Sequence, residues 1–219
     1  SQADVKKHVG KMVKRQKGIG RAVDKLTKPK VWLYVATPVH SDVSIHYTQS
    51  LLDIQKVCMK RNIATTFQLV KSSLVTQGRN LCVADFLSSK ATHLLFIDSD
   101  ISVEPETVFK MLEKDLEVIA APYALKTVNW DRAYQKMKSG LIKTRQDLAN
   151  SIFQYPIKVE DELDVEINEG VMEVTHAPTG CMLLKRSVFD KMREKYPSKS
   201  INQKTVINGE LVDNLILLI

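Results

Sequence analysis

The chain has 219 residues, of which 44% are hydrophobic, so it is long enough for one large domain with a sizeable core. It contains no apolar run near the roughly 20 residues that a membrane-spanning helix requires, and it does not open with the apolar stretch of a signal peptide. The formal net charge is +7, but residues 1–30 alone carry ten Lys or Arg and two Asp, so the basic character belongs to that segment rather than to the domain.

Residues 1–29 form the first predicted element. Their apolar residues recur at spacings of three, four and seven, which favours an amphipathic helix with a basic face that Pro29 ends. Such a helix would pack on the domain or on a partner chain. Contact of residues 1–28 with a membrane surface or a nucleic acid, and disorder, are the alternatives. No specific nucleic-acid partner is expected.

Strands and helices then alternate through the domain, residues 30–219. The expected strands are 31–36, 63–70, 94–97 and 118–121, and the expected helices end near residue 61 or span 79–88 and 105–114. Beyond Tyr123 the pattern weakens. The expected elements there are a helix at 144–150, strands at 171–175 and 181–184, and a helix at 187–195 capped by Ser187. The acidic stretch 160–164 is expected to be a solvated surface.

This alternation predicts an α/β fold, with a mostly parallel sheet flanked by helices. In such sheets, ligands bind beyond the carboxyl ends of the strands. The loops at 37–42, 71–78 and 98–102 all leave carboxyl ends, so we expect them to share one edge of the sheet.

Two carboxylates follow the strand in T-H-L-L-F-I-D-S-D, residues 92–100. Residues i and i+2 of an extended chain point to the same side, so Asp98 and Asp100 would converge if the strand continued through Ser99. Two like charges so close need a proton or a cation, and carboxylate oxygens suit Mg²⁺ or Mn²⁺ with a phosphate completing the shell. Turn or helix-cap aspartates are the alternative for an isolated D-x-D.

The three cysteines, Cys58, Cys82 and Cys181, are odd in number and lack the spacing of a metal site. This usage indicates buried thiols in a reducing compartment, and therefore a cytoplasmic protein, with peripheral membrane contact left open. A zinc site is not expected.

Four stretches stand in a characteristic order: Q-G-R-N-L-C-V-A-D-F-L (77–87), the D-S-D strand, A-A-P-Y (120–123) with N-W-D-R (129–132), and P-T-G-C-M-L-L-K-R-S-V-F-D-K-M (178–192). Together they resemble the GT-A-type glycosyltransferases that carry a DxD motif, over about residues 30–197. The resemblance implies a GT-A-like sheet and transfer of a hexose from a UDP- or GDP-sugar to a hydroxyl of a glycan or other acceptor. It also implies Mn²⁺ or Mg²⁺ as cofactor.

The resemblance assigns roles to individual residues. Asp100 would be the main metal ligand, and Asp98 would help through the ribose or a metal-bound water. Contacts with the nucleotide-sugar are implied for Thr37, Pro38, His40, Arg79, Asn80, Asp98, Ser99 and Gly180. His176 is a weaker match for a further metal-binding histidine, and a structural role is its alternative. Arg79 begins a predicted helix, where the helix dipole disfavours a cation, and a bound phosphate would remove that conflict.

The catalytic base is not assigned. Inverting members of the family often supply a carboxylate beyond the P-T-G stretch, and here that region offers only Glu210 and Asp213, in a pattern that does not match. The chain ends on the apolar run 215–219, which indicates a domain cut short or a segment destined for packing.

Two other classes of function remain open. A sugar nucleotidyltransferase would also use acids at a strand end with Mg²⁺, but it would normally have a glycine-rich, basic loop after the first strand. The stretch T-P-V-H-S-D (37–42) has neither glycine nor lysine. A non-catalytic binding module built around the basic N-terminal helix is the second alternative.

Overall fold

The computed structural model describes residues 31–160, 165–207 and 210–217. The predicted basic helix at 1–29 lies outside these residues, as does most of the acidic stretch at 160–164. Among the helices that these ranges contain, none is both long enough and apolar enough to cross a membrane.

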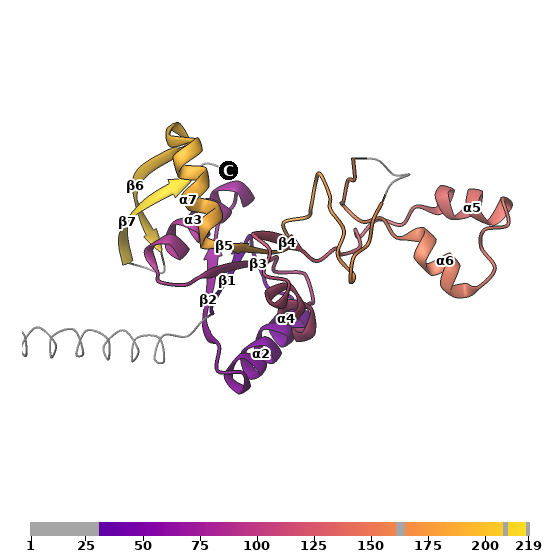
Figure 1. Ribbon diagram of the computed structural model, residues 1–219, viewed down its shortest axis with the longest axis horizontal. Helices are drawn as coiled ribbons and strands as arrows, with labels where there is room; N and C mark the ends of the chain where they lie inside the picture. The colour runs from indigo at the N-terminus through magenta and orange to yellow at the C-terminus, as the bar shows by residue number, and fades with distance from the viewer. Residues whose placement is uncertain (1–30, 161–164, 208–209, 218–219) are drawn as a thin grey trace, which may run out of the picture.

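Five strands form the central sheet in the order β2-β1-β3-β5-β4 (Figure 1). Their bounds are β1 Trp32–Val39, β2 Ala64–Lys71, β3 His93–Ile97, β4 Val118–Ala120 and β5 Cys181–Lys185. β1 pairs in parallel with β2 and β3, whereas β5 pairs antiparallel with both β3 and β4. The predicted α/β architecture is therefore confirmed, and in its sheet β5 is antiparallel to the other four strands.

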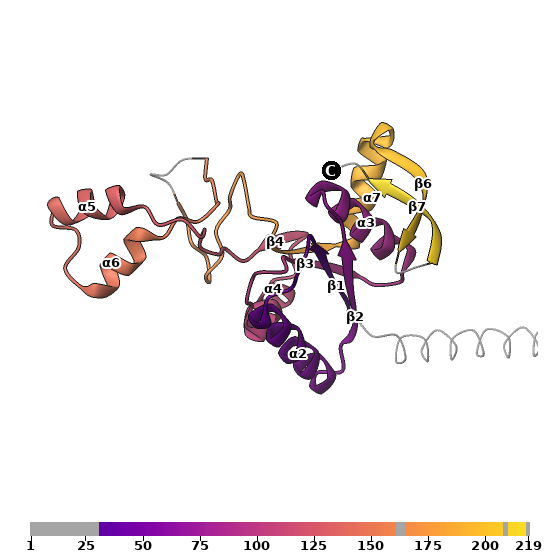
Figure 2. The same ribbon diagram turned by 180° about the vertical axis from the view of Figure 1, so that it is seen from behind.

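Helices cover both faces of this sheet (Figures 1 and 2). One face packs against α2 (Ile45–Lys60) and α4 (Pro105–Glu113), and the other against α3 (Val75–Ser88) and α7 (Arg186–Lys195). In β1, Leu33 and Val35 belong to the first core cluster, and Tyr34 and Ala36 to the second. Alternate residues of a strand point to opposite faces, so this uninterrupted apolar run needs cover on both sides.

The three cysteines lie in these two clusters. All three are buried free thiols, as the sequence predicted. Burial raises the pKa of Cys58 and Cys181 to about 11 and that of Cys82 to about 12. At neutral pH the thiols are therefore protonated and act as small apolar core residues.

Two boundaries near the carboxyl edge differ from the prediction. β1 continues through Val39, so residues 37–39 are strand rather than loop. Their backbone pairs with residues 69–71 of β2, a long-range constraint that local sequence does not carry. α3 begins at Val75, four residues earlier than expected, after a turn in which the Ser72 hydroxyl accepts a hydrogen bond from the Leu74 amide.

The second half of the chain holds further elements: α5 (Trp130–Lys138), α6 (Arg145–Ile152), η1 (Pro197–Lys199), and the antiparallel pair β6 (Ser200–Ile207) and β7 (Glu210–Leu217). α6 confirms the helix expected at 144–150, and a capping box between Thr144 and Asp147 begins it. α5 was not predicted. The strand expected at 171–175 is wrong, because this stretch forms only isolated bridges around a tight turn at Glu169 and Gly170. The predicted Ser187 cap is also wrong, since Lys185 holds the N-cap position of α7.

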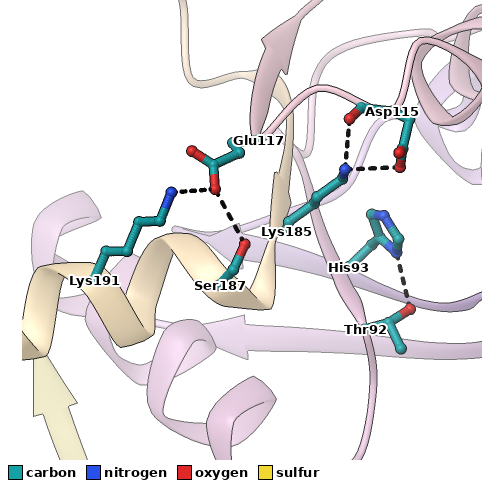
Figure 3. Close-up of polar contacts among 7 residues, drawn as sticks. All are labelled: Thr92, His93, Asp115, Glu117, Lys185, Ser187 and Lys191. Atoms are coloured by element: carbon teal, nitrogen blue, oxygen red, sulfur yellow. Dashed lines mark hydrogen bonds and ion pairs between the residues drawn. The ribbon is translucent and has the colours of Figure 1, made fainter.

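A group of polar contacts joins β5 and α7 to the segment between α4 and β4, near the start of β3 (Figure 3). Lys185 lies 2.7 Å from an Asp115 carboxylate oxygen, and Lys191 lies 2.6 Å from Glu117. His93 shares a 2.8 Å hydrogen bond with the Thr92 hydroxyl. Burial lowers the pKa of His93 below its usual 6.5, and the nearby charge of Lys185 lowers it further.

We predict that His93 makes the stability of the protein depend on pH in mildly acidic solution. The folded chain binds a proton at His93 more weakly than the unfolded chain does. The contribution of His93 to the free energy of unfolding is therefore fully present above the pKa of histidine in the unfolded chain, and it is lost as the pH drops below about 6.5. Urea unfolding at about pH 7 and about pH 5.5 should show a smaller loss for His93→Gln than for the unmodified protein. Carboxylates such as Glu117, whose pKa lies below 4.5, act at lower pH. Equal losses for the two proteins would contradict the prediction.

Candidate functional site

The candidate site lies at one edge of the sheet, where β1, β2 and β3 end and β5 begins. The Ser72 amide, just after β2, donates a 2.9 Å hydrogen bond to the Val39 carbonyl at the end of β1. The Asp98 amide, just after β3, donates a 2.9 Å hydrogen bond to the Gly180 carbonyl, just before β5. The shared edge predicted for the three loops is therefore present, and the start of the reversed strand β5 joins it.

The chain turns sharply at the two carboxylates. β3 ends at Ile97, and the Ile101 amide donates a 3.1 Å hydrogen bond to the Asp98 carbonyl, which closes a turn over residues 98–101. The Ser99 carbonyl accepts a 2.9 Å hydrogen bond from the Ser44 amide, at the N-cap of α2. The extended geometry considered for Asp98 to Asp100 is therefore not found, because this contact with α2 bends the chain immediately after the strand.

Each carboxylate of this turn has its own cation. Arg79 Nη2 donates to both carboxylate oxygens of Asp98, at 3.1 and 3.3 Å. Lys126 Nζ lies 2.5 Å from Asp100 Oδ2. The Asp98 side chain is 26% exposed and the Asp100 side chain 51% exposed, so the first pair is mostly enclosed and the second faces solvent. The repulsion between the two acids is thus offset by two basic residues that come from different parts of the chain.

Arg79 is positioned by the close approach of α3 to β1. A Cβ on Gly78 would lie 3.1 Å from the Pro38 Cβ, so the helix rests almost directly on the end of the strand. Asp85, further along α3, accepts a hydrogen bond from the Tyr34 hydroxyl of β1. Because α3 begins at Val75, Arg79 lies one turn inside the helix, and the predicted conflict with the helix dipole does not arise. Its Nε is buried and has no hydrogen-bond partner.

Gly180 lies at a position where the Cβ of any other residue would collide with neighbouring atoms. A Cβ at this position would lie 2.6 Å from Ile101 Cδ1, 2.6 Å from the Tyr123 hydroxyl and 2.8 Å from Asp98 Oδ2. The side chain of Tyr123, which the sequence did not single out, therefore lies beside Asp98. Burial raises the pKa of Tyr123, and the charge of Asp98 raises it further. The sequence signal for this residue was its place in A-A-P-Y, the stretch that ends β4 and continues to residue 123.

The other residues expected to contact a nucleotide-sugar divide into enclosed and accessible ones. Thr37 is fully buried, and its hydroxyl shares a 2.5 Å hydrogen bond with the Tyr47 hydroxyl of α2, so its side chain serves the core. Asn80 is buried in α3. Ser99 is partly exposed, and His40 is exposed just beyond the end of β1. Of this group, His40, Ser99 and the partly exposed Pro38 are the ones that a ligand can reach directly.

The weaker candidates lie elsewhere. His176 is exposed, pairs with Lys158 through a backbone bridge, and has its ring Nδ1 3.3 Å from the Thr175 hydroxyl. Glu210 and Asp213 lie on β7, opposite Ile207 and Lys204 of β6. The β6–β7 pair lies beside α3 and α7 (Figures 1 and 2). In the described ranges, no three His, Cys, Asp or Glu side chains gather as a ready metal-binding group.

Asp100 is the residue that best fits a divalent cation. Its carboxylate is half exposed, and Lys126 already places a positive charge 2.5 Å from one oxygen. Both oxygens of Asp98 are held by Arg79, so this carboxylate is better suited to a supporting position. Oxygen donors of this kind suit Mg²⁺ or Mn²⁺, which bind one or two carboxylates and take further ligands from water or phosphate. A separate hollow of about 450 Å³ lies at the start of α5 and shares no residue with this site.

Comparisons with known proteins add little to this picture. No family model and no curated protein matches the chain. Among solved structures, the chain is similar to the one titled "Crystal Structure of A197 from STIV", with 18% sequence identity, 74% of this chain and 68% of that chain covered, and a TM-score of 0.41. A TM-score this low carries no argument about fold or function.

We predict that the absence of a Cβ at residue 180 is needed for stability. Gly180→Ala would force its Cβ against three neighbouring atoms and should lower the free energy of unfolding by about 1–3 kcal/mol, measured by urea denaturation. Gly78→Ala is the matched control. Its nearest contacts, at 3.1 and 3.2 Å, are looser, and alanine favours the helix, so the change should stay within about 1 kcal/mol. A Gly180→Ala protein as stable as the control would contradict the argument.

Proposed function

We propose that the protein is a metal-dependent glycosyltransferase with a GT-A-like fold, which transfers a hexose from a UDP- or GDP-sugar to a hydroxyl of a glycan or other acceptor. One observation supports the proposal above the others. Asp98 after β3 contacts both Arg79 of α3 and Gly180 before β5, although the three residues come from stretches far apart in the sequence. These are the stretches on which the resemblance to the family rests.

The sheet is also in keeping with the proposal. The carboxylates follow a central parallel strand, β3, at the edge where ligands bind in α/β sheets. β5, the strand that follows the P-T-G stretch, runs antiparallel between β3 and β4, and this brings Gly180 back to the same edge. A nucleotide at this edge would have His40 beyond the end of β1 and the enclosed Arg79–Asp98 pair beneath it.

The side chains of the site suit a diphosphate. Arg79 keeps a guanidinium beside Asp98, where it adds positive charge to the site, and Lys126 lies exposed beside Asp100, so Lys126 is the cation that phosphate oxygens could reach directly. Asp100 would hold the divalent cation, with Asp98 behind it. A bound Mn²⁺ or Mg²⁺ would offset the negative charge that develops on a departing diphosphate. The missing Cβ at Gly180 lets the side chains of Tyr123 and Asp98 lie close to its backbone, beside the proposed donor site.

We assign no catalytic base. Glu210 and Asp213 belong to the β6–β7 hairpin, whose strand β7 packs beside α3. A retaining mechanism would need no such base. The stereochemistry of transfer is therefore left outside the proposal.

We predict that nucleoside diphosphates and their sugars stabilise the full chain only together with a divalent cation. In a thermal-shift screen, a UDP- or GDP-sugar with Mn²⁺ should raise the melting temperature, because a ligand bound by the folded state alone stabilises that state. Ligand at about 100 times its Kd would add about 2.7 kcal/mol. Asp100→Ala should abolish the shift, and Glu113→Ala on α4, which removes an exposed carboxylate elsewhere, should retain it.

Other outcomes of the same screen would count against the proposal. A shift with nucleoside triphosphates but with no diphosphate sugar would favour a sugar nucleotidyltransferase. No shift with any nucleotide, together with an Asp100→Ala protein that behaves as the unmodified one, would leave the glycosyltransferase proposal without support and favour a binding module.

A further inference from the structure

The segment from residue 122 to residue 158 leaves the sheet after β4 and carries α5 and α6. Both views show these helices at the opposite end of the molecule from β6 and β7 (Figures 1 and 2). We call this segment the arm. It is joined to itself by backbone bonds, from the Asn129 amide to the Ile152 carbonyl at 3.0 Å and from the Leu125 amide to the Gln154 carbonyl at 2.7 Å. The arm is therefore a helical hairpin built on local contacts.

α5 has well-defined ends. The Asn129 side chain accepts a 2.9 Å hydrogen bond from the Arg132 amide and caps the first turn. At the other end, the Gly140 amide bonds to the Met137 carbonyl and the Leu141 amide to the Lys136 carbonyl, with Gly140 at φ +72°. This is the arrangement of a Schellman motif, which only glycine adopts easily. It fixes Leu141 directly after the helix.

One face of α5 is apolar and uncovered. Trp130, Tyr134 and Met137 follow spacings of four and three, which place them on one side of the helix, and Leu141 follows directly after its end. Their exposed fractions run from 52% to 68%, whereas Ala133 is the residue of α5 that is buried. Two aromatic and two aliphatic side chains therefore lie exposed on α5 and directly after it, and we call these four residues the apolar row.

The arm is basic and the rest of residues 31–219 is acidic. Residues 122–158 contain seven Lys or Arg and two Asp, a net charge of +5. The other residues from 31 onward carry −6, since residues 31–219 together carry −1. Lys138 lies 5.1 Å from the centre of the Tyr134 ring, so a cation borders the apolar row directly. Apolar and positively charged groups are thus collected on one part of the molecule.

We propose that the apolar row of α5 inserts into the interface of a membrane that carries anionic lipid headgroups. A short amphipathic helix with Trp, Tyr and aliphatic residues on one face and lysines beside them has the composition that binds at this boundary. Trp and Tyr prefer the headgroup level, and each basic residue near an anionic surface adds attraction. The acidic remainder of the domain is repelled by the same surface, which orients the arm toward it.

Two other occupants fit less well. A symmetric dimer through α5 would bring a second +5 arm against the first, and like charges oppose that contact. A single-stranded nucleic acid would stack on Trp130 and Tyr134, but Met137 and Leu141 offer no face for stacking. Lipid acyl chains, in contrast, would cover the side chains of Met137 and Leu141.

The test uses the emission of Trp130 in the full chain. The sequence has two tryptophans, and Trp32 is held in β1 by a 3.0 Å hydrogen bond from its Nε1 to Thr66. Residues 1–30 contain none, so binding through that basic segment does not report on this signal directly. Vesicles of phosphatidylcholine mixed with phosphatidylglycerol in equal parts should shift the emission to the blue. Vesicles of phosphatidylcholine alone should bind roughly tenfold or more weakly, and Trp130→Phe should remove the shift.

Variants on two helices separate the arm from the rest of the surface. Tyr134→Ser with Met137→Ser should abolish the shift, whereas Leu52→Ser with Met59→Ser on α2, an equally exposed apolar pair, should retain it. Lys136→Glu with Lys138→Glu should weaken binding to anionic vesicles far more than Lys56→Glu with Lys60→Glu, which changes the net charge equally. All eight positions are partly or fully exposed, and melting temperatures verify that each variant folds.

Four results would overturn the proposal. The first is sedimentation of the chain with anionic vesicles while the Trp130 emission stays unchanged. The second is an equal shift with both vesicle types. The third is a shift caused by single-stranded DNA and not by vesicles. The fourth is a dimer in sedimentation velocity that the Tyr134→Ser, Met137→Ser variant dissolves.

Discussion

The charge balance at the turn after β3 is the constraint on which the site depends. Asp98 and Asp100 are one residue apart, and in a partly enclosed position two such acids need opposite charges close by. The fold supplies them separately, with Arg79 from the helix before the strand and Lys126 from the start of the arm. The turn itself is held by the Ser44 amide. The helix α2, the helix α3 and the arm therefore all meet at these two carboxylates.

The sequence predicted the sheet well because its signals are local. The apolar run of β1 must be covered on both faces, and the beginning of α4 at Pro105 follows from the fixed φ of proline. The failures share a different cause. The bend at Ser99 depends on an amide 55 residues earlier, and the burial of Thr37 depends on Tyr47 of α2. Such contacts join distant parts of the chain, and the local spacing of residue types does not predict them.

The candidate site was foreseen only in part, for the same reason. The pattern of an apolar strand before D-S-D identified the edge of the sheet and the two acids. The resemblance brought in Arg79 and Gly180, but neither it nor the spacing indicated that Arg79 would clasp Asp98 with its Nη2 or that Tyr123 would close over Gly180. The sequence pattern indicates which strands and helices meet at an edge of the sheet. The partner of each side chain depends on how the helices pack.

Lys126 connects the candidate site to the arm. It lies at the root of the arm and pairs with Asp100, so the segment that leads to α5 is attached to the turn after β3 by one exposed ion pair. Exposed pairs of this kind contribute little to stability, so the attachment is easily exchanged. A divalent cation at Asp100 would compete with the lysine for the same oxygen and free its ammonium for a phosphate. The cation and the diphosphate would then exchange the partner of Lys126 from Asp100 to a phosphate oxygen, and the lysine would stay at the same edge of the sheet.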